Sequence, residues 1–215
     1  RGKEELIEYG VVPAITGTLA DTSRDVRRCA VGALMALSVD ENGKCEIMEH
    51  SLGQLTRLLL DEYDSVRNNA RITIVHASEN RRARFQFVRE CVQTWPGSIA
   101  QSSELVLRVF GMDAAEPLCE LLAPSAGEGE DVIERVCVTI CDLIDGFGDR
   151  GNDAMMSTLY ITERLAACLA AKRETTRVAS GEALVKLCAK HKYAVKRLKT
   201  CGVGENCPEG LVQYL

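Results

Sequence analysis

The chain has 215 residues, of which 46% are hydrophobic, 27% are charged and only 5% are aromatic. This composition is typical of a soluble, helix-rich protein. The formal net charge of −5 excludes the global positive field that draws proteins onto nucleic acid, and no apolar run approaches the ~20 residues that a membrane span requires.

The N-terminal part of the chain predicts two units of three helices each. Helical spacing of apolar residues places helices over residues 2–9, 11–20 and 23–38, and then over 42–50, 51–60 and 64–78. In the first long helix, one buried stripe is expected from Val26, Ala30, Ala33, Leu34 and Leu37. Residues 21–23 and 61–64 supply side-chain oxygens that are expected to cap the long helices.

Internal repetition predicts the fold class. Residues 11–50 match residues 51–90 without a gap, so that Arg27 pairs with Arg67, and an offset of 150 residues pairs Arg27 with Arg177. A period of ~40 to 47 residues with helical patterning is typical of armadillo and HEAT arrays. Because each unit has a short, a medium and a long helix, the three-helix plan is favoured. We therefore predict an all-α fold, a right-handed superhelical solenoid of armadillo repeats.

The middle of the chain departs from this register. Over residues 91–112 the repeat is lost, Trp95-Pro96-Gly97 breaks any helix, and residues 104–110 supply only a short helical stripe. Residues 124–131 predict a flexible acidic loop. The expected organisation is two regular repeats and the first helix of the next in 1–91, a degenerate repeat or bend in 92–112, two further repeats in 113–200, and a C-terminal tail in 201–215.

Ten cysteines are scattered along the chain without a single Cys-x-x-Cys pair, so the spacing disfavours a zinc site. Six are expected among apolar residues of helices as small hydrophobes, namely Cys29, Cys119, Cys137, Cys141, Cys168 and Cys188. This use of cysteine indicates a reducing, cytoplasmic compartment. For Cys201 and Cys207, a turn with two free thiols and a small disulfide or half of a metal site are the alternatives.

No group of residues predicts catalysis. His50, His76 and His191 lie in different units without aligned nucleophile or acid partners. Two carboxylate groups, Glu4-Glu5 and residues 128–131, are interpreted as a solvated helix start and a loop. No glycine-rich phosphate loop occurs. We therefore expect no enzyme activity, no cofactor, no metal and no small-molecule substrate.

Two basic clusters are candidate protein-binding surfaces. No acidic residue lies between positions 186 and 199, and this stretch carries Lys190, Lys192, Lys196, Arg197 and Lys199. Such a patch suits an acidic tail or a microtubule surface, with a solvated face at the end of the array as the alternative. The second cluster comprises Arg81, Arg82, Arg84 and Arg89, which suit carboxylates of a partner or of the neighbouring repeat.

Residues 26–91 resemble a known family. The run Gly32-Ala33-Leu34-Met35, the turn Asn42-Gly43-Lys44 and an arginine-rich closing helix are similar to those of the radial spoke head protein 14 family, armadillo proteins of motile cilia. The resemblance implies a structural role in the ciliary axoneme, in which the solenoid docks radial spoke or microtubule-associated proteins. After Cys91 this sequence departs from the family by continuing into further repeats.

The armadillo resemblance also defines candidate groove positions. Armadillo proteins that hold extended peptides carry an Asn on each long helix, one position before the last core hydrophobe. The register places Ala36, His76, Asp142 and Lys186 at that position. These side chains lack the paired donor and acceptor of an amide. The groove is therefore not expected to bind import peptides in extended form.

The sequence thus predicts a non-catalytic scaffold with protein partners, in the cytoplasm and in the cilium or flagellum axoneme. Two alternatives stay open. One is a soluble armadillo adaptor in nuclear transport, transcription or ubiquitin ligation, and the other is a regulatory subunit of an enzyme.

Overall fold

The computed structural model describes residues 2–94, 98–203 and 207–215, and within these ranges the regular structure is helical throughout, without a strand. The all-α prediction is confirmed. The chain divides into two compact units, residues 1–87 and 88–215, which are described separately. Within the described ranges, no helix has the length and apolar character needed to cross a membrane.

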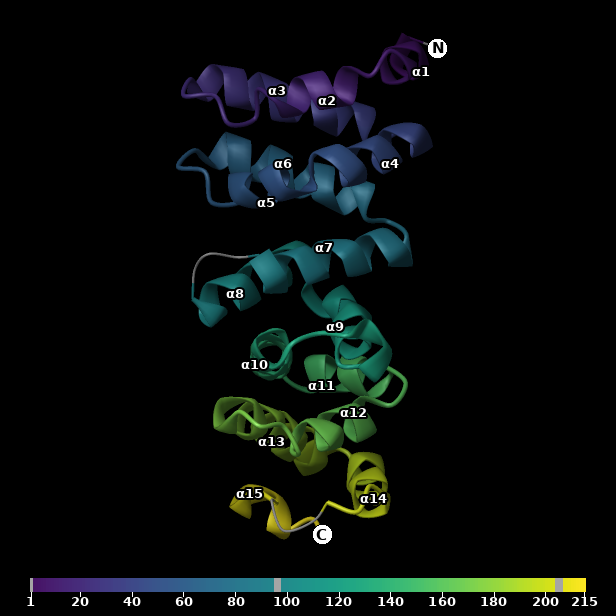
Figure 1. Ribbon diagram of the computed structural model, residues 1–215, viewed down its shortest axis with the longest axis vertical. Coiled ribbons are helices and arrows are strands. Elements are labelled where there is room, and N and C mark those ends of the chain that lie inside the picture. The colour runs from purple at the N-terminus through teal and green to yellow at the C-terminus, as the bar shows by residue number, and fades with distance from the viewer. Residues whose placement is uncertain (1, 95–97, 204–206) are drawn as a thin grey trace. The chain divides into compact units, whose positions relative to one another are not determined.

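The first unit contains two complete three-helix repeats (Figure 1). Its helices are α1 (Gly2–Glu8), α2 (Val11–Thr16), α3 (Arg24–Leu37), α4 (Glu41–His50), α5 (Leu52–Leu58), α6 (Asp64–Ala77) and the first half of α7 (Arg81–Thr94). The predicted boundaries agree to within one or two residues, except that α2 ends at Thr16 and turns follow it up to residue 20. The long helices α3 and α6 pack side by side, which is how armadillo repeats stack.

The second unit continues the same plan. It contains the second half of α7, then α8 (Ile99–Phe110), the 3₁₀ turn η1 (Gly111–Ala114), α9 (Ala115–Leu121), the 3₁₀ turn η2 (Pro124–Ala126), α10 (Glu130–Phe147), α11 (Asp149–Met156), α12 (Ile161–Cys168), α13 (Glu174–Lys190), α14 (Lys192–Thr200) and α15 (Glu209–Val212). Helix α10 packs against both α8 and α13. The three-helix armadillo plan therefore extends to α13, whereas the right-handed winding of the whole chain stays a prediction.

Helix α8 is longer than expected. It has twelve residues and begins with a capping box, in which the Ser98 hydroxyl accepts from the Gln101 amide and the Gln101 side chain accepts from the Ser98 amide. Leu105, Val106 and Val109 are buried against the unit. The short stripe predicted for residues 104–110 was wrong because the capping signal was overlooked. The predicted break at Trp95-Pro96-Gly97 lies outside the described residues.

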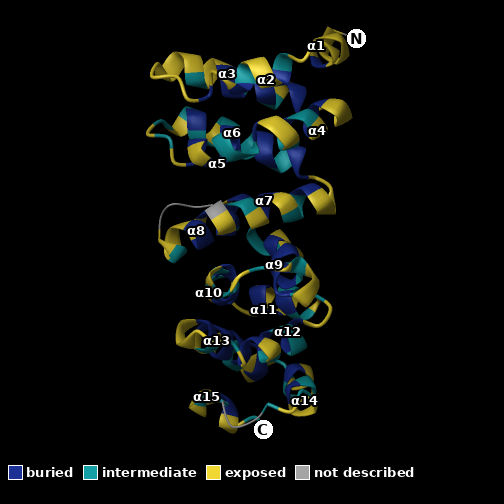
Figure 2. Cartoon of the chain, viewed as in Figure 1, coloured by how far each residue is buried: buried dark blue, intermediate teal, exposed yellow. Residues whose placement is uncertain are grey.

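Burial follows the predicted stripe except at Val26, which is exposed, and Ala33, which is half-buried. Ala30, Leu34 and Leu37 are buried in α3, and Figure 2 shows the buried residues on helix sides that face neighbours within each unit. Val26, however, is 38% exposed although its counterpart Val66 is fully buried. A stripe residue is covered only where an adjacent repeat reaches it. Cys29 is also exposed, because it lies one residue, or about 100°, off the stripe.

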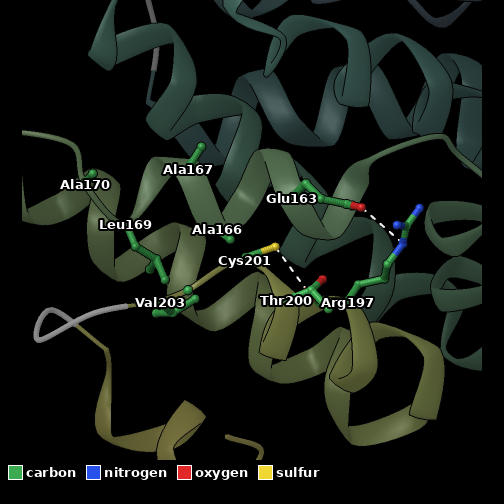
Figure 3. A pocket seen from close by; sticks show the side chains of 10 residues that line it. Glu163, Ala166, Ala167, Leu169, Ala170, Arg197, Thr200, Cys201 and Val203 are labelled. Carbon is green, nitrogen blue, oxygen red and sulfur yellow. Dashed lines mark hydrogen bonds and ion pairs between the residues drawn. The ribbon is translucent and has the colours of Figure 1, made fainter.

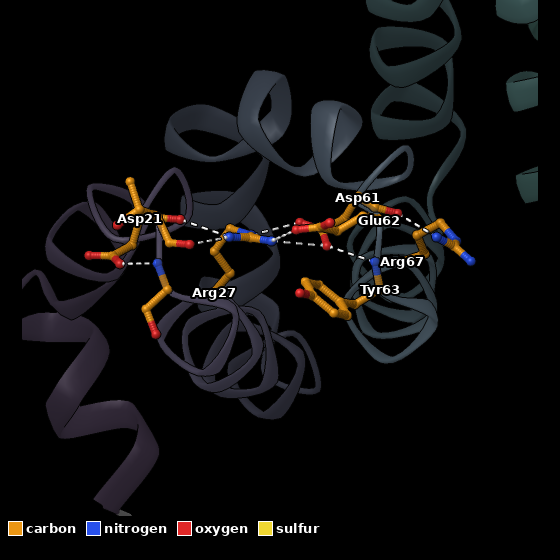
Figure 4. A network of polar contacts seen from close by, with 8 residues as sticks. Asp21, Arg27, Asp61, Glu62, Tyr63 and Arg67 are labelled. Atoms are coloured by element: carbon orange, nitrogen blue, oxygen red, sulfur yellow. Dashed lines mark hydrogen bonds and ion pairs between the residues drawn. The ribbon is translucent and has the colours of Figure 1, made fainter.

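The turns before the long helices are held by an arginine of the helix that follows. Arg27 donates from Nη1 to the carbonyls of Asp21 and Thr22, both at 3.0 Å (Figure 4). Arg67 and Arg177, its counterparts in the repeat register, bond the matching carbonyls of Asp61 and Ala171. The predicted caps are found in part: Asp21 and Asp61 accept through Oδ1 from the amides of Ser23 and Tyr63, at 2.7 and 3.0 Å. Ser23 and Tyr63 themselves, the N-cap residues of α3 and α6, make no side-chain cap bond.

Glycine sets the approach of two short helices, α4 and α11, to the long helix before each. A Cβ at Gly43 in α4 would lie 2.2 Å from the carbonyl oxygen of Leu37, and one at Gly151 in α11 would lie 2.5 Å from that of Leu143. Both glycines are the third residue of their helix and meet the last part of the long helix before it. This close backbone contact explains the need for glycine at these two positions.

Candidate protein-binding surface

The basic stretch predicted near the C-terminal end divides into free and engaged side chains. Lys192, Lys196 and Lys199 lie at i, i+4 and i+7 of α14 and are all exposed, so they share one face of the helix. In the described part of the chain, their side chains make no hydrogen bond or ion pair. We name these three residues the lysine stripe.

The other predicted cations of this stretch are bound within the chain. Lys190 Nζ lies 3.0 Å from Asp149 Oδ1, and Arg197 Nε lies 3.1 Å from Glu163 Oε1. The Arg197 guanidinium also lies over the ring of Tyr193, at 5.3 Å from its centroid. These cations hold α13 and α14 against α11 and α12. Of the five cations predicted in this stretch, the three of the lysine stripe are therefore the ones without a described partner.

An open groove of about 660 Å³ runs between α12 and α14 (Figure 3). Its lining is Glu163, Ala166, Ala167, Leu169, Ala170, Arg197, Thr200, Cys201, Gly202 and Val203. The Glu163–Arg197 ion pair lies on one side of the groove, and the remaining lining side chains are small or apolar (Figure 3). Sequence reasoning missed this groove, although Glu163, Ala166, Ala167 and Ala170 follow helical spacing.

The thiol of Cys201 belongs to the wall of this groove. Cys201 Sγ donates to the carbonyl of Arg197 at 3.2 Å. Burial raises the pKa of this thiol above its usual value, which disfavours the reactive thiolate. Cys201 and Cys207 are both unbonded to another sulfur. The geometry thus gives Cys201 a packing role.

The arginine cluster of α7 is largely engaged in contacts inside the chain. Arg89 Nε donates to Glu128 Oε1 at 2.7 Å, and Gln93 donates to the other Glu128 oxygen at 2.6 Å. Arg84 donates to the Glu79 carbonyl at 3.2 Å, and Arg81 also has a partner in the chain. Arg82 is exposed. Of the two possibilities given for this cluster, pairing with a carboxylate inside the chain therefore applies to Arg89.

In the acidic loop before α10, Asp131 is exposed as expected, whereas Glu128 and Glu130 are bound within the chain. The Glu128 side chain is only 3% exposed because it is bound by α7. Glu130 accepts from the backbone amides of Lys172 and Arg173 at 2.9 and 2.8 Å. These two backbone bonds lower the pKa of Glu130 below its usual value. The prediction was wrong for these two carboxylates because both find partners about one repeat away in sequence.

The four positions predicted for a peptide groove along the long helices mostly carry side chains that bond the neighbouring long helix or the residue after it. His76 Nδ1 lies 3.1 Å from Ser38 Oγ, Asp142 accepts from Ser103 Oγ at 2.5 Å, and Lys186 Nζ donates to Asp145 at 2.6 Å. Ala36 offers no polar side chain, and its carbonyl accepts from Lys3 Nζ at 2.9 Å. These residues are occupied by helix-to-helix contacts, so none forms a free ladder for a peptide backbone.

The histidines make ordinary contacts with nearby carboxylates or hydroxyls. His50 Nε2 lies 3.5 Å from Glu46, and His191 Nε2 lies 3.3 Å from Asp153. Glu46, Glu49 and His50 also place ligand atoms within 4.8 Å of one another on α4. The sequence spacing i, i+3, i+4 could have revealed this trio. Three accessible ligands on a single helix do not define a metal site.

No family model matches the sequence, and no curated protein matches it. Among solved structures, the chain is similar to an engineered protein of the Northeast Structural Genomics Consortium, target OR366, with 15% identity, TM-score 0.44 and coverage of 94% of both chains. It is also similar to the designed armadillo repeat protein YIII(Dq)4CqI, with 15% identity, TM-score 0.43 and coverage of 95% of this chain and 98% of that one.

A third similar structure is the designed armadillo repeat protein YIII(Dq.V1)4CPAF in complex with the peptide (KR)4. It has 17% identity and TM-score 0.39, with coverage of 99% of this chain and 82% of that one. At these TM-scores, the function of the chain has to be derived from its own residues.

Proposed function

We propose that this protein is a non-catalytic scaffold that binds an acidic segment of another protein through the lysine stripe of α14. The observation that carries the proposal is the division of the basic stretch. Lys190 and Arg197 have carboxylate partners inside the chain, whereas Lys192, Lys196 and Lys199 are exposed, aligned and without a partner among the described residues.

Local charge favours an acidic protein over a nucleic acid. The chain as a whole carries a net charge of −5, so a long polyanion would be repelled outside the stripe. Three lysines on successive turns span roughly 10 Å along the helix axis, at 1.5 Å per residue. A short run of Asp or Glu side chains fits this length.

Charge reversal of the lysine stripe tests the proposal. Fluorescence anisotropy of a labelled ten-residue polyglutamate peptide is expected to show saturable binding that weakens as salt is added. The triple variant Lys192→Glu, Lys196→Glu, Lys199→Glu is expected to weaken binding by roughly tenfold or more, because each exposed charge contributes ~0.2–1 kcal/mol.

A matched control keeps the change in net charge the same. Arg57, Arg108 and Arg150 are exposed, and their joint reversal to Glu is expected to leave the affinity within about twofold of the parent. Equal weakening by both triple variants would mean that net charge alone governs binding, and it would overturn the lysine stripe as the site. Circular dichroism checks that both variants keep their helices.

For the cellular setting, we propose a structural role in the ciliary axoneme, in which the acidic partner is a radial spoke or microtubule-associated protein or the microtubule itself. The support is the sequence resemblance over residues 26–91 together with the lysine stripe. Co-sedimentation with microtubules, lost in the triple lysine variant and kept in the arginine control, is the expected result. Absence of the tagged protein from isolated axonemes would contradict this setting.

A further inference from the structure

We infer that the groove between α12 and α14 is the seat of an amphipathic helix, supplied by a partner protein with apolar residues on one face and carboxylates beside them. This inference rests on the proposed function of the lysine stripe and adds the shape of the partner. It follows from a comparison of the first and the last repeat in the chain's own register.

One contact in the first unit identifies the counterparts of the groove. Thr16 Oγ1 of α2 lies 2.5 Å from Ser51 Oγ, the residue just before α5. The offset of 150 residues that aligns Arg27 with Arg177 places Ala166 at the position of Thr16 and Cys201 at that of Ser51. Both Ala166 and Cys201 line the groove. The groove therefore corresponds to the place in the first unit where α5, the second helix of its repeat, begins.

The chain takes a different course after this point in the last repeat. After Ser51, the helix α5 starts at once with Leu52. After Cys201 comes Gly202 in the left-handed region, with φ of 61°, and the next described helix, α15, begins only at Glu209. Within the described residues, no second helix directly follows α14, and α12 keeps an accessible face of small side chains.

The side chains that line the groove are suited to binding a helix. Ala167 and Ala170 are exposed and Ala166 is half-buried, so beyond Glu163, which is held by Arg197, the α12 side of the groove carries small side chains. Leu169 and Val203 add apolar surface. An occupant with Leu or Ile at i, i+3 and i+7 would place its apolar face on this wall, as helices do in hydrophobic grooves. Leu52 and Leu55 of α5 and Leu59, the residue just after it, follow this spacing.

The charge beside the groove selects an acidic occupant. Arg197 and Thr200 of α14 line the groove, while Lys196 and Lys199 neighbour them in the same helix. Glu163 is already neutralised by Arg197 at 3.1 Å, so it does not repel a carboxylate. A helix in the groove can therefore direct Asp or Glu from its flank to the lysine stripe.

Two synthetic probes separate the groove from the stripe. The first is a labelled 16-residue helix with leucines on one face and glutamates beside them, and the second is the polyglutamate peptide. Anisotropy is expected to show at least tenfold tighter binding of the leucine–glutamate helix, because only this probe buries apolar surface in the groove.

Variants that fill the groove with a large side chain provide the decisive test. Ala170→Trp is expected to weaken the leucine–glutamate helix about tenfold and to leave polyglutamate unchanged, and Ala167→Trp should act in the same way from a second exposed position. The matched control is Ala20→Trp, since Ala20 is the exposed counterpart of Ala170 in the first unit. Circular dichroism confirms that each variant is folded.

The outcomes distinguish the two proposals. If both tryptophan variants bind the leucine–glutamate helix as the parent does, the groove is not its seat, although the stripe survives. If reversal of the lysine stripe weakens neither probe, the proposed function itself is wrong. If sedimentation shows a dimer of the parent that Ala170→Trp dissolves, the occupant is a second copy of this chain, and the assignment to a partner protein is overturned.

Discussion

Arg27 and Asp61 join the turns of two successive repeats, with Nε of the arginine 2.7 Å from Oδ2 of the aspartate across 34 residues of sequence. Their side chains are only 11% and 5% exposed. Burial alone would raise the pKa of Asp61, but the hydrogen bonds from Arg27 and from the Tyr63 amide outweigh it and lower that pKa. Because Arg27 also donates to the carbonyls of Asp21 and Thr22, the pair links the turn before α3 to the turn before α6.

Loss of the Asp61 carboxylate is expected to destabilise the first unit. Asp61→Ala leaves the guanidinium of Arg27 without its buried partner, and we expect a loss of about 2 to 3 kcal/mol in the free energy of unfolding. Urea unfolding followed by circular dichroism measures it. Asp25→Ala, which removes an exposed pair with Arg28 at 3.4 Å, is the control, with an expected loss below about 1 kcal/mol. Equal losses would contradict a special role for Asp61.

Glu130 makes stability depend on pH in the acid range. Its pKa is lowered from the ordinary value of 4.5 by the Lys172 and Arg173 amides. A carboxyl with a depressed folded-state pKa contributes stability that is complete above the unfolded value and is lost as pH falls through the folded value. Glu130→Gln is therefore expected to be less stable at pH 7 and to lose less stability on acidification below pH 4.5. An unchanged acid slope in thermal melts would refute this assignment.

Alanine has opposite expected effects at two kinds of helical glycine. Gly43→Ala places a methyl group 2.2 Å from the Leu37 carbonyl oxygen, and overpacking should cost about 1 to 3 kcal/mol. At Gly32 the nearest atom lies 3.8 Å away, so Gly32→Ala should stabilise α3 by roughly 0.5 to 1 kcal/mol. Urea unfolding of both variants checks the sign. A stabilising Gly43→Ala would show that α4 does not need this close approach.

Thiol labelling should separate the cysteines by burial. In the native protein, Cys29 and Cys45 are exposed and are expected to react first with an alkylating reagent at pH 8. Burial raises the pKa of Cys141 to about 12 and that of Cys188 to about 11, so these two should react slowly. In denaturant without reductant, mass spectrometry should find all ten cysteines labelled. Protection of Cys201 and Cys207 there would reveal a disulfide and contradict the free-thiol assignment.

Basic import peptides are not expected to bind along the long helices. Asp142 and His76 occupy the groove positions, but they bond Ser103 and Ser38, and their side chains lack the paired donor and acceptor of an amide. Anisotropy with a labelled import-signal peptide should show no saturable binding at micromolar concentration. Tight binding that is lost in Asp142→Ala and His76→Ala would promote the adaptor alternative.

Local sequence patterns were sufficient for the helices and for part of the repeat register. The offsets that aligned Arg27, Arg67 and Arg177 identified a shared structural position, because each arginine bonds the carbonyls of its own turn, five or six residues before it. Contacts this short are encoded within one repeat. The capping box of Ser98 and Gln101 was equally local, and it could have predicted the full length of α8.

The candidate sites depended on contacts that sequence spacing does not reveal. Glu128 was expected to be solvated, yet Arg89, 39 residues earlier in sequence, binds it. The basic stretch was predicted as one patch, yet Asp149 and Glu163 pair with Lys190 and Arg197 and neutralise their charges. Sequence by itself determined the helical repeats, because hydrophobic periodicity and turn chemistry act over a few residues. Only the tertiary structure decided which charges and which helix face stay free, because stacking brings together residues about one repeat apart.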